Sequence, residues 1–206
     1  MLKYIKKPNT NTEIFSILHP YLKKWFKGKF GEFSAPQKYG IMPIHNRDNT
    51  LIFAPTGTGK TLTAFTSIIN ELTILSEQEK LEDRVYCVYI SPLKALSRDI
   101  KVNLTDPLES IKEIAKKKGK KIDIRVSTRT GDTKASEKAK MLRKPPHILI
   151  TTPESFGIVL TSPKFRLLLN NLEYVIVDEI HSLASNKRGV HLSLSLERLQ
   201  NYSNFT

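Results

Sequence analysis

Five short apolar runs divide the chain into segments. Each run is rich in β-branched and aromatic residues and shows little alternation with polar residues, as is typical of strands buried on both faces. The runs are TLIF at 50–53, RVYCVYI at 84–90, IDIRV at 122–126, HILI at 147–150 and EYVIV at 173–177. We therefore expect five buried strands.

Longer segments between the runs show the apolar spacing of amphipathic helices. They are 62–75, 93–118, 134–142 and 154–169, with Pro107 expected to break the second. Strands that alternate with helices predict an α/β fold, in which a mainly parallel sheet is covered by helices on both faces. Residues 1–49 show helical patches instead, with Pro20 suited to a helix start, and are expected to form a helical extension of a core at 50–206.

A polar cluster directly follows each apolar run. The clusters are APTGTGKT, SPLKALSRD, STRTGDT, TTPES and DEIH. Ligands of parallel sheets bind outside the carboxyl ends of the strands. The sequence therefore predicts that the five clusters meet at one functional edge.

The charge balance favours a polyanionic partner. The chain has 33 Lys and Arg against 20 Asp and Glu, a net charge of +13, which suits nucleic acid but also serves solubility. The lysine run at 116–121 precedes a predicted strand and so belongs to the opposite edge. We interpret it as the last turn of a helix, with Gly119 as its C-terminal cap.

The single cysteine, Cys87, lies in an apolar run and is expected to be a core residue, which excludes a disulfide framework. The sequence shows neither an apolar stretch of about eighteen residues nor a charged-then-apolar leader. We therefore expect a cytoplasmic protein without a membrane span.

Residues 54–61 end as the Walker A loop G-x-x-x-x-G-K-[ST] ends, although Ala54 stands at the position of the first glycine. Backbone N–H groups of such a loop, followed by a helix N-terminus, hold phosphates without blocking attack on the γ-phosphorus. Lys60 would reach the β- and γ-phosphates, and the Thr61 hydroxyl would bind Mg²⁺. An ordinary glycine-rich turn is the alternative, but it does not require Lys-Thr after the last glycine. The other expected loop residues are Thr56, Gly57, Thr58 and Gly59.

An acidic pair, Asp178 and Glu179, follows the last apolar run. In a P-loop enzyme the Asp holds Mg²⁺, and a neighbouring carboxylate orients or deprotonates the attacking water. Such a pair often only caps a helix. Together with the glycine-rich loop, it predicts a site that hydrolyses a nucleoside triphosphate.

The five clusters stand in the order of motifs I, Ia, Ib, Ic and II of superfamily 2 helicases, the DEAD/DEAH-box relatives. The stretch VDEIHSLASNKRGVHLSLSLERL resembles the large helicase-related (Lhr) group, in which DEIH replaces DEAD. Alanine at the first Walker position is usual in these families. The resemblance spans roughly residues 20–200. It implies a RecA-like P-loop NTPase domain, the first motor domain of an ATP-dependent helicase or translocase that moves on single-stranded DNA or RNA.

The same resemblance assigns further roles. Gln37 matches the glutamine that recognises adenine, although Ser34 and Gln37 also form the capping box S-x-x-Q. His181 would relay the nucleotide state to a partner domain, or cap a helix. Backbone phosphates of a nucleic acid would meet donors after the second, third and fourth strands. These candidates are Pro92, Leu93, Lys94, Arg98, Arg129, Gly131, Asp132, Thr152 and Pro153.

The sequence ends at Thr206, before the serine-alanine-threonine motif and the second RecA-like domain of the family. That domain supplies arginines that stabilise the transition state by roughly a thousandfold or more. We therefore expect ATP binding with feeble hydrolysis and no unwinding from these residues alone. The alternative is a non-catalytic nucleic-acid-binding module that uses nucleotide as a switch. A small-molecule P-loop kinase is disfavoured, because the sequence indicates neither an acceptor pocket nor a lid.

Overall fold

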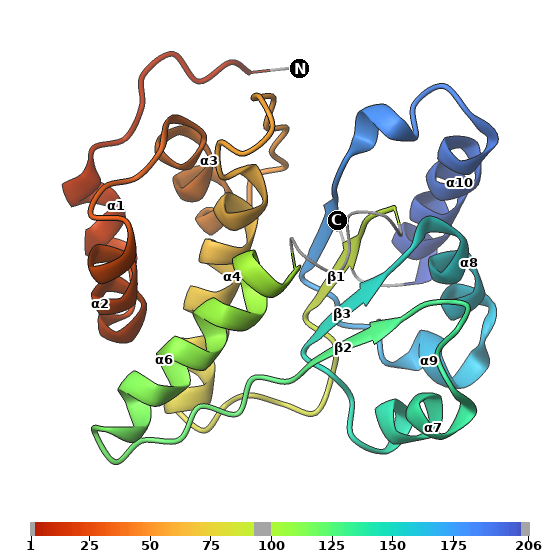
Figure 1. Cartoon of the computed structure of the whole chain (residues 1–206). Helices are drawn as coiled ribbons and strands as arrows, with labels where there is room; N and C mark the ends of the chain where they lie inside the picture. The colour runs from red at the N-terminus through yellow and green to blue at the C-terminus, as the bar shows by residue number, and fades with distance from the viewer. Residues whose placement is uncertain (1–2, 93–99, 203–206) are drawn as a thin grey trace. The chain divides into compact units, whose positions relative to one another are not determined.

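The computed structural model describes residues 3–92 and 100–202, which form two compact units (Figure 1). The first unit contains residues 1–81 and 98–123, and the second contains 82–97 and 124–206. The predicted phosphate loop therefore lies in the first unit, and the acidic pair lies in the second.

The described part of the first unit is helical. Its helices are α1 (Asn11–Ile17), α2 (Pro20–Lys29), α3 (Ala35–His45), α4 (Lys60–Glu77), a π-helical turn (Lys101–Thr105) and α6 (Asp106–Lys116). Pro20 is in the first turn of α2, as predicted. Pro107 lies in the first turn of α6, where its missing N–H is tolerated. Contrary to the prediction, it does not break the helix, because Thr105 and Asp106 are both αR and the π-helical turn runs directly into α6.

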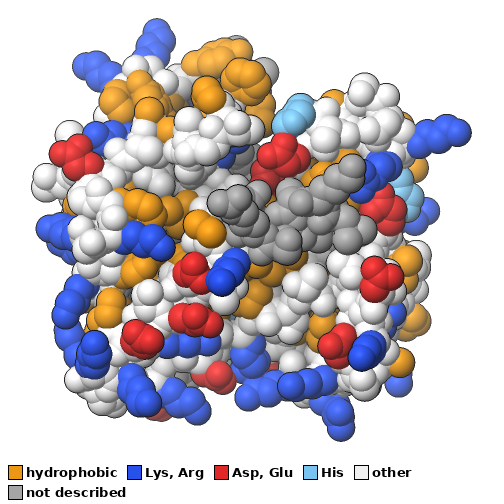
Figure 2. All heavy atoms as spheres, viewed as in Figure 1, with side chains coloured by type: hydrophobic (Ala, Val, Ile, Leu, Met, Phe, Trp, Pro, Cys, Tyr) orange, Lys and Arg blue, Asp and Glu red, His pale blue; other side chains and the backbone are white. Residues whose placement is uncertain are grey.

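The end of α6 confirms the cap predicted for the lysine run. Gly119 has φ +70°, and the N–H of Lys120 donates to the carbonyl of Ala115 over 3.0 Å. On the face drawn in Figure 2, Lys and Arg side chains are spread widely, with Asp and Glu side chains between them. The lysines at 116–121 are thus explained by helix termination.

Buried polar side chains of α4 hold the N-terminal helices in place. The Asn70 side chain accepts a bond from the His19 N–H over 2.6 Å and donates to the Ile17 carbonyl over 3.1 Å, at the junction of α1 and α2. The Ser67 hydroxyl donates to the Ile41 carbonyl of α3 over 3.1 Å. Helices α1–α3 are therefore bound to the helix that begins at the phosphate loop.

Asn70→Ala is expected to lower the free energy of unfolding of the first unit by about 2–4 kcal/mol, because a buried N–H and a part-buried carbonyl lose their partner. Chemical denaturation followed by the fluorescence of Trp25, the chain's one tryptophan, measures the change. Asn49→Ala changes an exposed loop residue of the same unit and is expected to stay within about 0.5 kcal/mol of the unmodified chain. Equal unfolding curves for Asn70→Ala and the unmodified chain would contradict the role of Asn70.

The second unit contains a four-stranded parallel sheet in the order β2-β3-β1-β4. In chain order its described elements are β1 (Cys87–Ile90), β2 (Val126–Arg129), α7 (Ala135–Arg143), β3 (Ile148–Thr151), α8 (Pro153–Thr161), α9 (Pro163–Leu167), β4 (Tyr174–Val177), a 3₁₀ helix (Ile180–Ser182) and α10 (Lys187–Tyr202). Cys87 pairs with Ile148 on one side and with Tyr174 on the other.

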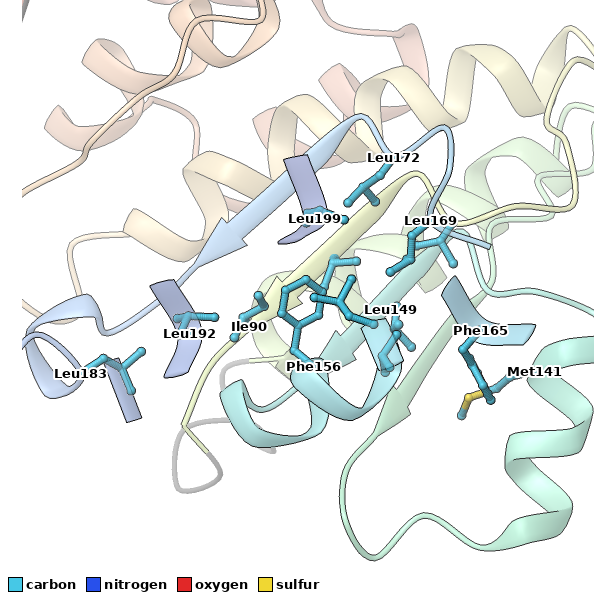
Figure 3. Close-up of a cluster of buried hydrophobic side chains, with 14 residues drawn as sticks. Ile90, Met141, Leu149, Phe156, Phe165, Leu169, Leu172, Leu183, Leu192 and Leu199 are labelled. Atoms are coloured by element: carbon cyan, nitrogen blue, oxygen red, sulfur yellow. The ribbon is translucent and has the colours of Figure 1, made fainter. Parts of the chain in front are cut away.

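A buried apolar cluster joins the sheet to its helices (Figure 3). Ile90 and Leu149 of the sheet pack with Phe156 of α8 and with Leu192 and Leu199 of α10. Cys87 is buried, as predicted, and its burial raises the pKa of the thiol. The cluster fixes α8 and α10, which carry two parts of the candidate site, against the same sheet.

Two strand predictions differ from the structure. Residues 50–53 form no strand and are not part of the sheet of the described residues. The side chains of Leu51 and Phe53 are 77% and 100% exposed, so this run is not a buried strand. The run 122–126 contributes only Val126, since β2 spans Val126–Arg129. Ile122 and Ile124 bury their side chains, but the N–H groups of Asp123 and Arg125 donate to side chains of Ser76 and His147.

The helix predicted at 154–169 also differs from the structure. The segment 154–169 is two helices, because α8 ends at Thr161 and α9 begins at Pro163. Ser162 between them has φ −81° and ψ 114°, an extended conformation. Proline favours this conformation in the preceding residue and has no N–H to continue the helical bonds.

Candidate functional site

The phosphate loop leads directly into α4. Gly57 and Gly59 have φ +77° and +93°, a left-handed conformation that glycine adopts without steric cost. Gly59 is the N-cap of α4, so Lys60 and Thr61 are its first two residues. The N–H groups in the first turn of a helix have no intrahelical acceptor and attract anions. The segment therefore has the backbone form of an anion-binding loop.

Lys60 lies across this loop. Its ammonium group donates to the carbonyls of Ala54 and Pro55 over 2.6 and 2.8 Å. The Thr58 hydroxyl donates to the same Pro55 carbonyl over 2.7 Å. The ammonium is thus held at the loop by carbonyl oxygens of its first two residues.

The N-terminus of α3 braces the loop. The Ser34 hydroxyl donates to the Thr58 carbonyl over 2.8 Å, and the Ser34 N–H donates to Oε1 of Gln37 over 2.8 Å. A Cβ at Gly59 would lie 3.0 Å from Nε2 of Gln37, so the Gln37 amide packs directly against the loop. The structure shows the capping direction of this amide, while adenine recognition by Gln37 stays a prediction.

In the second unit, the acidic pair follows β4. The Asp178 N–H donates to the Ile90 carbonyl over 2.9 Å, and the Asp178 carboxylate accepts from the Tyr89 hydroxyl over 2.5 Å and from the Glu179 N–H over 2.8 Å. Glu179 has φ +52°, an unusual conformation for a non-glycine residue, of the kind that is frequent at functional sites. His181 places Nε2 3.0 Å from the Glu179 carboxylate. The Asp178 carboxylate is thus held by hydrogen bonds, and Glu179 faces His181.

Thr152 and Pro153 begin α8 at the end of β3. Thr152 is 2% exposed and is the N-cap of α8, where its hydroxyl oxygen accepts from the Ser155 N–H over 3.3 Å. Gly131 and Asp132 lie in the exposed turn after β2, and the half-buried Pro92 follows β1. Leu93, Lys94 and Arg98 lie outside the described residues. Because the four strands are parallel neighbours, the described residues that directly follow them share one edge. The fifth predicted cluster, the phosphate loop, follows none of these strands and belongs to the first unit.

Arg129 is buried, which the sequence did not indicate. It is 6% exposed, and its guanidinium carbon lies 3.6 Å from the centroid of the Phe165 ring. Burial lowers the pKa of Arg129. The Thr151 hydroxyl donates to the Arg129 carbonyl over 2.7 Å. This stack gives Arg129 a packing role between β2 and α9, beside the nucleic-acid contact predicted from sequence.

Several polar residues of the site were missed by sequence analysis. Tyr89 lies between apolar residues in a buried strand, and no motif marks its bond to Asp178. Glu154 and Arg188 form an ion pair with a distance of 2.5 Å, although 34 positions separate them in the chain. Only the close spacing of Glu154 to Thr152 and Pro153 offered a signal in the sequence.

Gly189 lies in the first turn of α10, close to the backbone of the segment that precedes this helix. A Cβ there would lie 2.0 Å from the backbone oxygen of Leu183, so a substitution forces the backbone to move. Gly189→Ala is expected to lower the free energy of unfolding of the second unit by at least about 2 kcal/mol. Thermal denaturation followed by circular dichroism measures this loss. Gly131→Ala is the control, because a Cβ added there meets no atom within 4 Å. A similar loss of unfolding free energy in the two variants would contradict the predicted clash at Gly189.

A family model described as DEAD/DEAH box helicase matches residues 34–206 of this sequence. The match contains the phosphate loop, the acidic pair and the intervening polar clusters. This chain belongs to the DEAD/DEAH box helicase family. No described helix of this family member has the length and apolar character needed to cross a bilayer.

Particular relatives extend the comparison. ATP-dependent helicase Lhr-Core of Methanothermobacter thermautotrophicus is 58% identical over 200 residues, which are 97% of this chain and 23% of that protein. The structure of helicase Lhr of Mycobacterium smegmatis, bound to ssDNA and AMP-PNP, has a TM-score of 0.83 at 38% identity, over 93% of this chain and 24% of that one. A DEAD-box helicase bound to ssRNA and UDP-BeF has a TM-score of 0.75 at 20% identity, over 98% of this chain and 39% of that one, which shows the fold alone.

These relatives confirm the predicted resemblance to the Lhr group and the RecA-like fold of this helicase-family chain. The chain spans about a quarter of the length of these two Lhr proteins. The described residues contain no group of three or more His, Cys, Asp or Glu side chains that could hold a metal ion. Mg²⁺ in nucleotide enzymes needs fewer protein ligands than three, since one or two protein oxygens act together with substrate phosphates and water.

Proposed function

We propose that this chain is the ATP-binding motor domain of a helicase or translocase that acts on single-stranded DNA or RNA. The observation that carries the proposal is the glycine-shaped loop that opens α4, with the Lys60 ammonium held across it. The core at 50–206 provides the motor, and residues 1–49 are its helical extension. A second RecA-like domain would complete the ATP site, so hydrolysis by these residues alone is slow.

Each residue of the nucleotide site has a separate role. Lys60 and the N–H groups of residues 56–61 bind the phosphates, because they are the cation and the backbone donors of a glycine-rich loop at a helix start. The Thr61 hydroxyl and the Asp178 carboxylate are oxygen ligands of the type that fits Mg²⁺. Bound Mg²⁺ would neutralise the charge of the β- and γ-phosphates. Glu179 accepts a proton from the attacking water.

The nucleic-acid track follows the sheet edge of the second unit. Gly131, Asp132, Thr152 and Pro153 lie after neighbouring parallel strands and offer backbone donors and a helix N-terminus to phosphates. Pro92, Leu93, Lys94, Arg98 and Arg129 extend this proposed track. Contacts of this type carry no base sequence information, so binding is sequence-independent and falls with salt. His181 passes the state of the nucleotide to the partner domain.

Gln37 distinguishes adenine from guanine in this proposal. Its amide oxygen bonds the Ser34 N–H, and its amide nitrogen faces Gly59. Gln37→Glu keeps the oxygen that caps α3 but replaces the nitrogen donor, so the preference for ATP over GTP is expected to fall by about tenfold, the loss of one hydrogen bond to a base. Titration of both nucleotides measures the ratio of the dissociation constants. An unchanged ratio would limit Gln37 to capping.

The proposed function is tested by titrating the chain into a fluorescein-labelled single strand of DNA or RNA, with and without Mg²⁺ and AMP-PNP. Fluorescence anisotropy reports the dissociation constant. We expect binding that weakens steeply with salt and that nucleotide changes by about fivefold or more, a typical coupling between sites. Binding of neither nucleotide nor nucleic acid would refute the proposal.

A further inference from the structure

A series of side-chain bonds connects the acidic pair to the start of α8. The 3₁₀ helix that follows Glu179 ends at Ser182, and the Ser182 carbonyl accepts from the Asn186 amide over 2.7 Å. The Asn186 side-chain oxygen accepts from the Arg188 N–H over 3.0 Å, at the start of α10. The Arg188 guanidinium then reaches Glu154 in the first turn of α8.

The last step has the geometry of a directed ion pair. Nε of Arg188 lies 2.5 Å from one carboxylate oxygen of Glu154, and Nη2 lies 3.4 Å from the other. The Nε bond is short and the Nη2 contact is long, so the pair is oriented mainly through Nε. Both side chains are about half exposed, at 42% and 50%. Ion pairs with this exposure contribute little to the free energy of unfolding. The pair is therefore of interest for the orientation that it gives the two side chains.

The pair lies between the two regions that a motor has to couple. Glu154 directly follows Thr152 and Pro153, which we assign to the nucleic-acid track. Arg188 is tied through Asn186 to the turn that follows Asp178 and Glu179, which we assign to the nucleotide site. We propose that Glu154 and Arg188 are positioning residues that transmit the nucleotide state from this turn to the nucleic-acid end of α8.

This inference rests on the proposed function, because it needs a chain that binds both ligands. It predicts that the pair controls the linkage between them. The linkage ratio is the dissociation constant for a fluorescein-labelled oligo-dT or oligo-U strand without nucleotide, divided by the constant with Mg²⁺ and AMP-PNP. Such coupling can be carried by a connected series of hydrogen bonds and ion pairs that has two discrete arrangements, when each ligand favours the same one.

The experiment compares Arg188→Glu, Glu154→Arg and the double variant with the unmodified chain. In each single variant we expect the linkage ratio to move to one. The dissociation constant without nucleotide is expected to follow the sign of the reversed charge, lower for Glu154→Arg and higher for Arg188→Glu, because Glu154 directly follows the proposed nucleic-acid track. The double variant restores opposite charges and is expected to regain the ratio. Arg198→Glu is the matched control, since it makes the same charge change at an exposed position of α10 and is expected to keep the ratio.

Thermal denaturation of every variant identifies any that fail to fold, and Arg188→Gln or Glu154→Gln then takes the place of the unfolded variant, with the same expected loss of linkage. An unchanged ratio in folded single variants would overturn the inference. A double variant that regains no linkage would also overturn it. If the unmodified chain binds both ligands with a ratio of one, this inference fails and binding of both ligands by the chain stands. If the chain binds neither ligand, the proposed function fails as well.

Discussion

Lys60→Ala is expected to weaken the binding of Mg²⁺–ATP by about 1.5–3 kcal/mol, roughly tenfold to 150-fold, the range for hydrogen bonds to charged groups. The Lys60 ammonium is held across the phosphate loop by the carbonyls of Ala54 and Pro55. Alanine removes the charge that balances the phosphates and leaves the backbone donors of the loop in place. Isothermal titration of the chain with ATP and Mg²⁺ measures the loss.

Lys24→Ala is the control, because Lys24 is an exposed lysine of the same unit, on α2. It removes one positive charge far along the chain from the loop and is expected to leave the ATP affinity within about twofold, as for a screened surface charge. Circular dichroism shows whether Lys60→Ala keeps its helices. Equal affinities of Lys60→Ala and the unmodified chain would show that the loop is an ordinary turn.

Glu179→Gln is expected to reduce ATP turnover at least about a hundredfold and to leave ATP binding within about twofold, as for the loss of a general base. The amide has the size of the carboxylate but accepts no proton from water. Glu179 has φ +52° in the turn after β4, and the substitution changes only its side chain. Turnover is measured by phosphate release, and binding by titration.

The matched control is Glu197→Gln, which makes the same change at an exposed position of α10 and is expected to keep the turnover of the unmodified chain. If Glu179→Gln also keeps this turnover, Glu179 has no catalytic role. Together with nucleotide-dependent binding of nucleic acid, that result would favour the alternative of a non-catalytic module switched by nucleotide.

Burial explains which strands could be predicted. The runs that contain β1, β3 and β4 are buried or half-buried, and their apolar patterns located these strands to within three residues. The run at 50–53 has a similar composition, but a strand also needs a hydrogen-bonded neighbour, which a local pattern does not specify. Ile122 and Ile124 are buried but precede the strand, so their pattern placed β2 four residues too early.

The same distinction applies to the candidate site. The phosphate loop was predictable because its chemistry is local: two glycines at left-handed positions, followed by Lys60 and Thr61 at a helix start. The Glu154–Arg188 pair was not, since exposed charges far apart in sequence show no pattern. The direction of the Gln37 amide was left open as well, because capping and adenine recognition require the same residue type.

The most direct test of the account is ATP turnover by this chain with Mg²⁺, measured with and without single-stranded DNA and RNA, beside Lys60→Ala. We predict slow turnover that increases with at least one nucleic acid and is lost in the variant. Such a result would establish that the phosphate loop drives a nucleic-acid-coupled motor site. Turnover that is equal in the two proteins, or that no nucleic acid changes, would contradict it.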